Sequence, residues 1–289
     1  MAVSESAIST PPGGRGLSLT SKRILRHLTI LATLLVVWEL STRLGLLDEL
    51  TFPRPLAIVQ SMYELYLVQG SIWWHLFITI AEVLAGFAAG SALGIGLAII
   101  VGLNPLVRRF LKPYVIVLEA TPRIAVAPLL IAALGFGWSS KVAIITLVCF
   151  FAPFVNTLSG MLNVNEEAHQ LFRSLGANKR QIFMKLMLPD ATPIIMAGLR
   201  LAMASALSGA LVAEFISANE GMGVLLKRYT ASLNMASSFA CLLSLTALGF
   251  LIFRTMEAID NRVVFWRKDE RAATVGRRRA AAWHRKMGA

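Results

Sequence analysis

The stretch FITIAEVLAGFAAGSALGIGLAIIVGL, residues 77–103, contains a single charged side chain, Glu82. A helix needs about 20 predominantly apolar residues to cross a bilayer, and this run exceeds that length. Gly86, Gly90 and Gly94 recur at four-residue steps, which places them on one face of a helix. Small residues on one face allow a second helix to approach closely in lipid. The stretch therefore predicts a membrane-spanning helix with a close helical neighbour.

The composition of the whole chain also indicates a membrane protein. Hydrophobic residues make up 56% of the 289 residues and charged residues 15%, whereas soluble globular domains average about 45–50% and about 25%. The net charge of +12 comes from Lys and Arg that flank apolar runs, without interleaved aromatic residues. We interpret this charge as a signal of membrane topology, and the pattern argues against a nucleic-acid partner.

Six apolar runs are predicted to cross the bilayer, so the predicted fold class is an all-α membrane protein with six transmembrane helices. The first run is the weakest because Glu39 and Arg43 lie in its outer half. The third contains Pro122 and Pro128, which predict a kink or a break. The runs cover residues 27–46, 77–103, 113–135, 142–163, 196–218 and 238–258.

The distribution of Lys and Arg outside these runs predicts the orientation. Basic residues concentrate in both tails, in the loop after the second run and in the loop 164–195. The positive-inside rule places these segments, and therefore both termini, in the cytoplasm. We predict a disordered tail over 1–24, a transmembrane domain over 25–262 and a basic tail over 263–289. The few basic residues on the opposite side are Arg54, Lys141, Lys227 and Arg228, with Arg43 at its edge.

The sequence offers little for catalysis or metal binding. Cys149 and Cys241 lie inside apolar runs, and the four histidines are scattered without ligand spacing, so we predict no metal and no cofactor. The chain has no G-x4-G-K-[ST] phosphate-binding loop, which predicts that it does not bind ATP itself. It also lacks acid–base pairs and nucleophile motifs. We therefore do not expect the chain to be an enzyme.

Two further features carry structural expectations. After Pro53 and Pro55, apolar residues recur at helical spacing over 58–66, which predicts a short amphipathic helix at the outer membrane surface or an exposed loop helix. Glu214 lies near the outer end of the fifth run. A carboxylate there either faces a bundle interior or a water-filled path, or it caps a neighbouring segment or reaches interfacial water.

The loop 164–195 predicts two short helices joined at a glycine. An apolar stripe over 167–175 ends at Gly176, a typical residue after a helix C-terminus. Asn178 with Gln181 three residues later predicts a capping box for a second helix over 179–187, ended by Pro189 and Pro193 before the fifth run. Lipid does not require such an amphipathic unit. It is typical of a helix that binds in a groove of a soluble partner.

This loop resembles the coupling loop of ABC importer permeases, whose pattern is E-A-A-x3-G-x9-I-x-L-P. With Gly176 as the glycine, the final Leu-Pro falls on Leu188 and Pro189, the isoleucine position is Leu186, and the acidic position is Gln170. Further stretches are similar to the nitrate, sulfonate and taurine branch: FPRPLAIVQSMYEL (52–65), TPRIAVAPLLIAALGFG (121–137), FFAPFVNTLSGM (150–161), PIIMAGLRLAMASALSGALVAEF (193–215) and GMGVLL (221–226).

The resemblance implies a MetI-like permease fold and an ATP-driven importer in the bacterial inner membrane. It implies two permease copies, favoured as a homodimer, two cytoplasmic ATPase subunits and an extracytoplasmic solute-binding protein. It implies import of a sulfonate, taurine, nitrate or a similar small anion. The candidate coupling residues are Gln170, Leu171, Phe172, Leu175, Gly176 and Ala177. The candidate pathway residues are Thr121, Arg123, Ala127, Ser205, Ser208, Gly209 and Glu214.

Three other classes remain open from the residues alone. A secondary transporter without an ATPase would need ion-coupling residues in the membrane and usually inverted repeats, which the sequence does not show. A membrane-embedded enzyme would need clustered catalytic polar residues at one membrane face. A basic membrane anchor would use the C-terminal RKDERAATVGRRRAAAWHRKMG to bind anionic lipid or protein.

Overall fold

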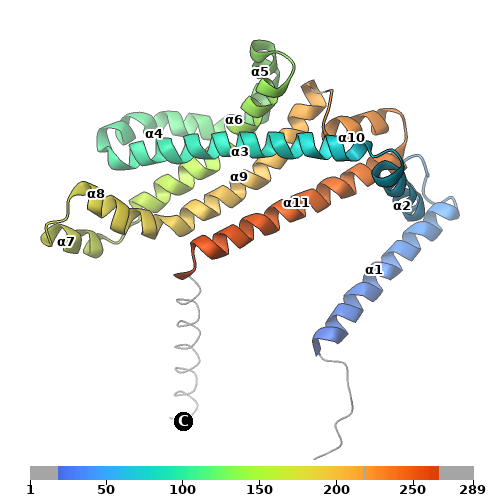
Figure 1. Ribbon diagram of the computed structural model, residues 1–289, viewed down its shortest axis with the longest axis horizontal. Coiled ribbons are helices and arrows are strands. Elements are labelled where there is room, and N and C mark those ends of the chain that lie inside the picture. The colour runs from blue at the N-terminus through green and yellow to red at the C-terminus, as the bar shows by residue number, and fades with distance from the viewer. Residues whose placement is uncertain (1–18, 218, 267–289) are drawn as a thin grey trace, which may run out of the picture.

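The computed structural model describes residues 19–217 and 219–266, which form helices and connecting turns without a strand (Figure 1). The predicted tails lie largely outside these residues. The helices are α1 (Leu19–Arg43), α2 (Pro55–Tyr63), α3 (Ser71–Leu103), α4 (Pro105–Ala120), α5 (Ala127–Leu134), α6 (Trp138–Leu162), α7 (Glu166–Ser174), α8 (Lys179–Ile182), α9 (Leu188–Ser217), α10 (Met222–Ala231) and α11 (Met235–Val263), with π turns at Glu64–Val68 and Phe183–Met187 and a 3₁₀ turn at Arg123–Val126.

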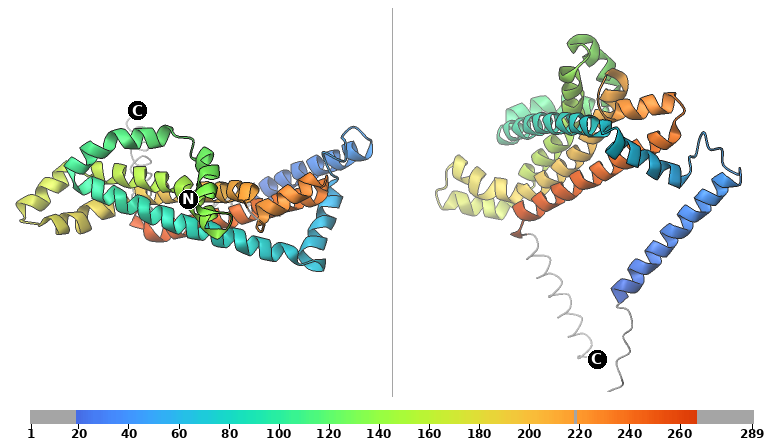
Figure 2. Two further views of the ribbon diagram at one scale, coloured as in Figure 1. Left: turned by 90° about the horizontal axis from the view of Figure 1, so that it is seen from above. Right: turned by 45° about the vertical axis from the view of Figure 1, so that its right-hand side comes forward.

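The centre of the molecule is a bundle of α3, α6 and α9 (Figures 1 and 2). Their shared core is built from small and medium side chains, because close helix packing rather than a hydrophobic driving force holds helices together in lipid. Helix α11 lies along α9, and α2 and α10 pack against α11. The short helices α7 and α8 lie at one end of the bundle (Figure 1). The shared core consists of Val83, Ile145, Cys149, Ala202, Met203, Ala206 and Ala210.

Helix α1 stands away from the bundle in Figure 1 and in the right-hand view of Figure 2. It reaches the rest of the chain near its C-terminal end, where the rings of Trp38 and Phe239 lie 6.1 Å apart. The amphipathic helix predicted after Pro53 is present as α2 and the π turn that follows it. It is not a plain exposed loop helix, because Ile58 and Leu65 are buried in a cluster with residues of α10 and α11.

The glycine face of α3 packs directly on α6, which confirms the close neighbour predicted from the spacing. A Cβ atom added to Gly90 would lie 2.6 Å from the Cys149 sulfur. One added to Gly94 would lie 2.5 Å from the Phe150 carbonyl oxygen. Backbone atoms cannot rotate away as a side chain can, so any larger residue at Gly94 must separate the two helices.

We expect Gly94→Val to destabilise the folded protein by about 1–3 kcal/mol, the usual cost of overpacking. The matched control is Gly96→Val. Gly96 lies on the same helix, and a Cβ atom added there would meet nothing within 4 Å. The measurement is the yield and melting temperature of detergent-extracted protein. Equal losses for both variants would show that helix propensity, and not the α3–α6 contact, determines the effect.

The third predicted span is not one helix. Helix α4 starts at Pro105, earlier than predicted, and ends at Ala120, after which Thr121 and Pro122 are extended. The physical reason is Pro122, which disfavours the helical conformation in the preceding residue. The broken path α4–α5 still leads from the end of α3 to the start of α6 (Figure 2). Among the described residues, five helices are long and apolar enough to cross a membrane, so the predicted count of six is not confirmed.

Two prolines also behave differently from the prediction. Pro189 and Pro193 do not end the helix that starts at Lys179, because helical structure continues without a break to Ser217. The π turn Phe183–Met187 shifts the hydrogen-bond register just before Pro189, which has no N–H to donate. Beyond it, the Thr192 hydroxyl donates to the Leu188 carbonyl at 2.6 Å. The second short helix is therefore the first part of the fifth span.

Candidate functional site

The first candidate site is the α7 unit, residues 165–181, at the end of the bundle where α6 finishes. The side chain of Asn165 caps α7 by accepting hydrogen bonds from the Glu167 and Ala168 amides at 2.8 and 3.2 Å. Acidic residues occupy its first turn and Arg173 its last turn, which complements the helix dipole. These local interactions hold α7 as a defined helix although none of its residues is buried.

Gly176 ends α7 in the geometry that the sequence predicts. Its φ is +75°, and a Cβ atom there would meet nothing within 4 Å. The Gly176 amide donates to the Arg173 carbonyl and the Ala177 amide donates to the Phe172 carbonyl, both at 3.0 Å. This pair of hydrogen bonds is the Schellman arrangement.

The predicted capping box at Asn178 and Gln181 is also present. The Asn178 amide donates to the Gln181 side chain at 2.8 Å, and the Gln181 amide donates to the Asn178 side chain at 2.9 Å. The backbone between α7 and α8 is therefore fixed by hydrogen bonds at Gly176, Ala177 and Asn178. The two helices and this connection form one ordered corner.

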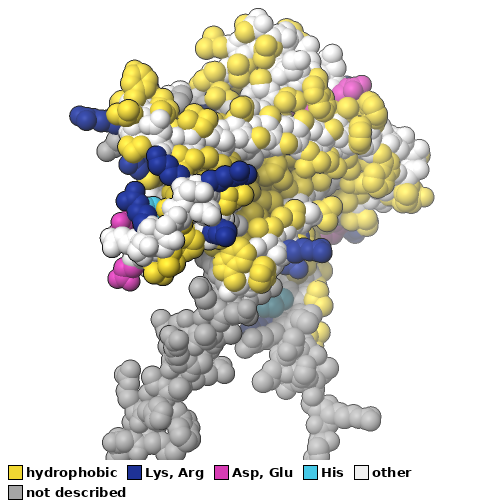
Figure 3. Space-filling model, turned by 60° about the vertical axis from the view of Figure 1, so that its left-hand side comes forward, with side chains coloured by type: hydrophobic (Ala, Val, Ile, Leu, Met, Phe, Trp, Pro, Cys, Tyr) yellow, Lys and Arg dark blue, Asp and Glu magenta, His cyan; other side chains and the backbone are white. Residues whose placement is uncertain are grey.

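The predicted apolar stripe divides between two directions. Leu171 and Leu175 are 57% and 76% exposed, whereas Phe172 and Ala177 are half-buried and Gln170 is exposed. Lys and Arg side chains gather on this end of the molecule (Figure 3). Leu171 and Leu175, one on α7 and one at its C-cap, therefore leave two large apolar side chains uncovered at this corner.

The predicted pathway residues of the third span lie around the break in the helix. The Thr121 hydroxyl donates to the Val117 carbonyl at 2.8 Å. The Arg123 guanidinium carbon lies 4.7 Å from the centre of the Phe151 ring, a cation–π contact with α6. Ala127 is fully buried in a cluster with Ile144 of α6. The break therefore brings Thr121 and Arg123 to a partly open position, while Ala127 is part of the core.

The predicted pathway residues of α9 lie on different faces of that helix. Ser208 is exposed and its hydroxyl donates to the Ala204 carbonyl at 3.3 Å. Ser205 is half-buried. Gly209 is buried against α6, where an added Cβ atom would lie 3.4 Å from the Val148 Cβ.

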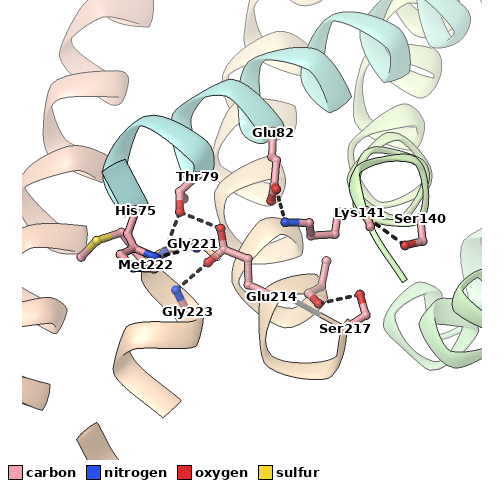
Figure 4. A network of polar contacts seen from close by, with 12 residues as sticks. His75, Thr79, Glu82, Ser140, Lys141, Glu214, Ser217, Gly221, Met222 and Gly223 are labelled. Atoms are coloured by element: carbon pink, nitrogen blue, oxygen red, sulfur yellow. Dashed lines mark hydrogen bonds and ion pairs between the residues drawn. The ribbon is translucent and has the colours of Figure 1, made fainter. Parts of the chain in front are cut away.

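Glu214 is 1% exposed and anchors the start of α10 (Figure 4). Its carboxylate accepts hydrogen bonds from the Thr79 hydroxyl at 2.6 Å and from the Gly223 amide at 2.5 Å. The Met222 amide donates to the Thr79 hydroxyl oxygen at 2.9 Å. The Gly221 amide donates to His75 Nδ1 at 2.9 Å. Side chains from α3 and α9 thus satisfy three amides at the N-terminus of α10, which is the capping alternative for Glu214.

Sequence reasoning missed His75 and Thr79 as members of this hydrogen-bonded cluster, which we call the Glu214 anchor. The available signal was Gly-Met-Gly at 221–223, because a Cβ at Gly223 would lie 2.8 Å from the Glu214 carboxylate. Such glycines mark a close approach of backbone to another group. The sequence did not indicate which side chains approach, since His75 and Thr79 lie about 140 positions earlier in the chain.

Lys141 is not an outer-loop cation as predicted. Helix α6 starts at Trp138, so Lys141 lies inside it, 6% exposed, and forms an ion pair with the fully buried Glu82 of α3 (Figure 4). The signal for this pair was Glu82 itself, because a carboxylate within a span requires a compensating partner. The pair joins α3 to α6 one turn away from the Glu214 anchor.

Comparison with known proteins identifies the family. Residues 90–265 match the model of the binding-protein-dependent transport system inner membrane component. The chain is 34% identical to the formylaminopyrimidine transport permease protein ThiX of Halalkalibacterium halodurans, over 82% of this chain and 94% of that protein. It is 29% identical to the putative aliphatic sulfonates transport permease protein SsuC of Bacillus subtilis, over 84% and 88%.

Two further similarities agree. The chain is 28% identical to the taurine transport system permease protein TauC of Escherichia coli, over 85% of this chain and 91% of that protein. In structure it is similar to the inward-facing MetNI methionine ABC transporter, with a TM-score of 0.59 and 18% identity over 69% of this chain and 97% of the other. The structural likeness supports a MetI-like fold. The chain belongs to the binding-protein-dependent inner membrane components, the permease subunits of ABC importers, and is a membrane transport subunit rather than an enzyme.

Proposed function

We propose that this permease works as a homodimer with two cytoplasmic ATPase subunits, each of which receives one α7 unit, and with an extracytoplasmic solute-binding protein. The observation that carries the proposal is the exposure of Leu171 and Leu175 on a hydrogen-bonded helical corner. An exposed apolar pair costs free energy unless a partner covers it. A rigid corner also transmits a displacement that a slack loop would absorb.

We infer the orientation from charge. The α7 unit carries exposed Arg173, Lys179 and Arg180, and the positive-inside rule places such a segment in the cytoplasm. Both chain termini then lie on the cytoplasmic side of the bacterial inner membrane. In this orientation the Glu214 anchor lies on the outer side, from which a binding protein would deliver solute.

For the solute path, we propose the face of α9 that its own bundle leaves open, together with the break before α5. Ser205 and Ser208 lie on or beside that face, and Thr121 and Arg123 lie at the break. Ala127, Gly209 and Glu214 are enclosed within the protomer. We therefore propose that they do not contact the solute and instead pack the helices that line the path. Arg123 gives this path a positive charge, which favours an anionic group on the solute.

For the solute itself, we propose a small organic or inorganic anion such as a sulfonate, taurine or nitrate. The relatives named for aliphatic sulfonates and taurine support this choice, while the relative named for formylaminopyrimidine makes formylaminopyrimidine the comparison compound.

The test is uptake by the complete complex in proteoliposomes, with ATP enclosed and binding protein outside. We expect accumulation of one of taurine, an alkanesulfonate or nitrate that requires both ATP and binding protein, because the permease has no motor of its own. Omitting the ATPase and applying only an ion gradient is the control. Uptake by the permease alone under that gradient would assign the chain to secondary transport instead.

A further inference from the structure

A groove of about 590 Å³ lies at the α7 end of the bundle, between the end of α3, the first half of α4 and the end of α6. Most of its wall is apolar, and two arginines of α4 complete it. The lining residues are Val101, Pro105, Arg108, Arg109, Leu111, Val115, Leu158 and Leu162.

The charges in the groove are of one sign. Arg108 is half-buried and Arg109 is exposed, and neither takes part in an ion pair with another described residue. The described lining includes no carboxylate. A smaller cavity of about 330 Å³, lined by α3 and α6, differs because Glu82 and Glu220 line it together with Lys141. The groove is therefore complementary to an anion.

The position of the arginines relative to the apolar wall adds a second constraint. Arg108 and Arg109 lie one turn from the start of α4, whereas Leu111 and Val115 lie one and two turns further along the helix. Leu158 of α6 lies on the same wall. With the membrane orientation proposed above, this order places the positive charge at headgroup depth and the apolar wall beside the acyl chains.

The outward surface of α4 is apolar as well. Leu106 is 79% exposed and Phe110 is 67% exposed, so α4 presents large apolar side chains beside the groove. Tyr114 follows on this surface, with its ring 5.5 Å from that of Phe110. Aromatic side chains are typical of the boundary between headgroups and acyl chains.

We propose that this groove binds one anionic phospholipid of the inner leaflet, with its phosphate on Arg108 and Arg109 and an acyl chain along Leu111, Val115 and Leu158. The occupant is a lipid and not a soluble anion, because a soluble anion would leave the apolar wall uncovered. The binding is independent of transport, so its test does not bear on the coupling of α7.

The test is native mass spectrometry of delipidated full-length protein titrated with phosphatidylglycerol or phosphatidylcholine of identical chains. We expect a marked preference for phosphatidylglycerol. Each basic residue near a membrane surface contributes about fivefold to the affinity, so Arg108→Gln with Arg109→Gln should reduce the affinity for phosphatidylglycerol about 25-fold. The matched control, Lys179→Gln with Arg180→Gln, removes the same charge from the same end of the molecule and should keep the preference.

A second variant tests the acyl chain. Leu162→Trp fills the groove without removing charge, so it should weaken the binding of phosphatidylglycerol. In a separate competition experiment on the unmodified protein, glycerol phosphate, which has no acyl chains, should not displace phosphatidylglycerol. The proposal is overturned if the two double variants lose affinity equally, since diffuse charge would then explain the binding. Equal competition by glycerol phosphate, or displacement of the lipid when the ATPase or a second permease copy assembles, would also overturn it.

Discussion

Replacing Gly176 with glutamate is expected to leave the permease folded in the membrane and to abolish ATP-driven uptake. Gly176 has a φ of +75°, a conformation that costs an L-residue about 1–2 kcal/mol. A glutamate there would loosen the hydrogen-bonded corner and place a carboxylate next to Leu175. If the leucines are buried in an ATPase groove, an unpaired charge beside them costs about 2–5 kcal/mol, or at least a 30-fold loss of ATPase binding.

Gly45→Glu is the matched control for this substitution. Gly45 has a φ of +72°, and a Cβ atom there also meets nothing within 4 Å, so the backbone strain is the same. It lies in the turn after α1, far from α7 in Figure 1. We expect this variant to retain ATPase co-purification and uptake. Similar uptake by the two variants would remove the basis for assigning a coupling role to Gly176.

The second large effect is expected at the buried ion pair between α3 and α6. Lys141→Met leaves the carboxylate of Glu82, which is fully buried, without its partner. Breaking a buried pair from one side typically costs about 3–5 kcal/mol, because the remaining charge is uncompensated. The measurement is the melting temperature and monodisperse yield of the protein in detergent.

Two further variants make this prediction specific. Lys141→Met combined with Glu82→Leu removes both charges and should recover most of the lost stability. Lys227→Met removes an exposed lysine of α10, whose ammonium donates to the Phe215 carbonyl, and should have little effect. A Lys141 variant as stable as the Lys227 variant would show that the pair does not hold α3 to α6.

The features that the sequence predicted well are those determined by nearby residues. The spacing of Gly86, Gly90 and Gly94 predicts a close neighbour whatever that neighbour is. Gly176 and the Asn178–Gln181 capping box determine the α7 corner within a few residues, and the structure confirms both. The coupling role of α7 and the solute path remain predictions, since they depend on partners outside this chain.

The features that the sequence did not predict depend on distant residues. Lys141 looked like a loop cation because nothing nearby shows that Glu82 lies opposite it on another helix. The three amides of α10 are satisfied by side chains of α3 and α9, a pairing that only the packed bundle defines. Pro189 does not end the helix, because the π turn Phe183–Met187 just before it shifts the hydrogen-bond register and lets the helix continue. A π turn has no strong sequence signature.

The most direct measurement of the central claim is cysteine crosslinking between α7 and the ATPase. Both native cysteines, Cys149 and Cys241, are buried, so an added surface cysteine is the main reactive thiol among the described residues. Leu175→Cys should crosslink to the ATPase subunit in the assembled complex. Leu46→Cys, at a leucine that is 74% exposed compared with 76% for Leu175, should not. An active complex in which Leu175→Cys forms no crosslink to the ATPase would contradict the claim that α7 contacts the ATPase and transmits its conformational change to the transmembrane bundle.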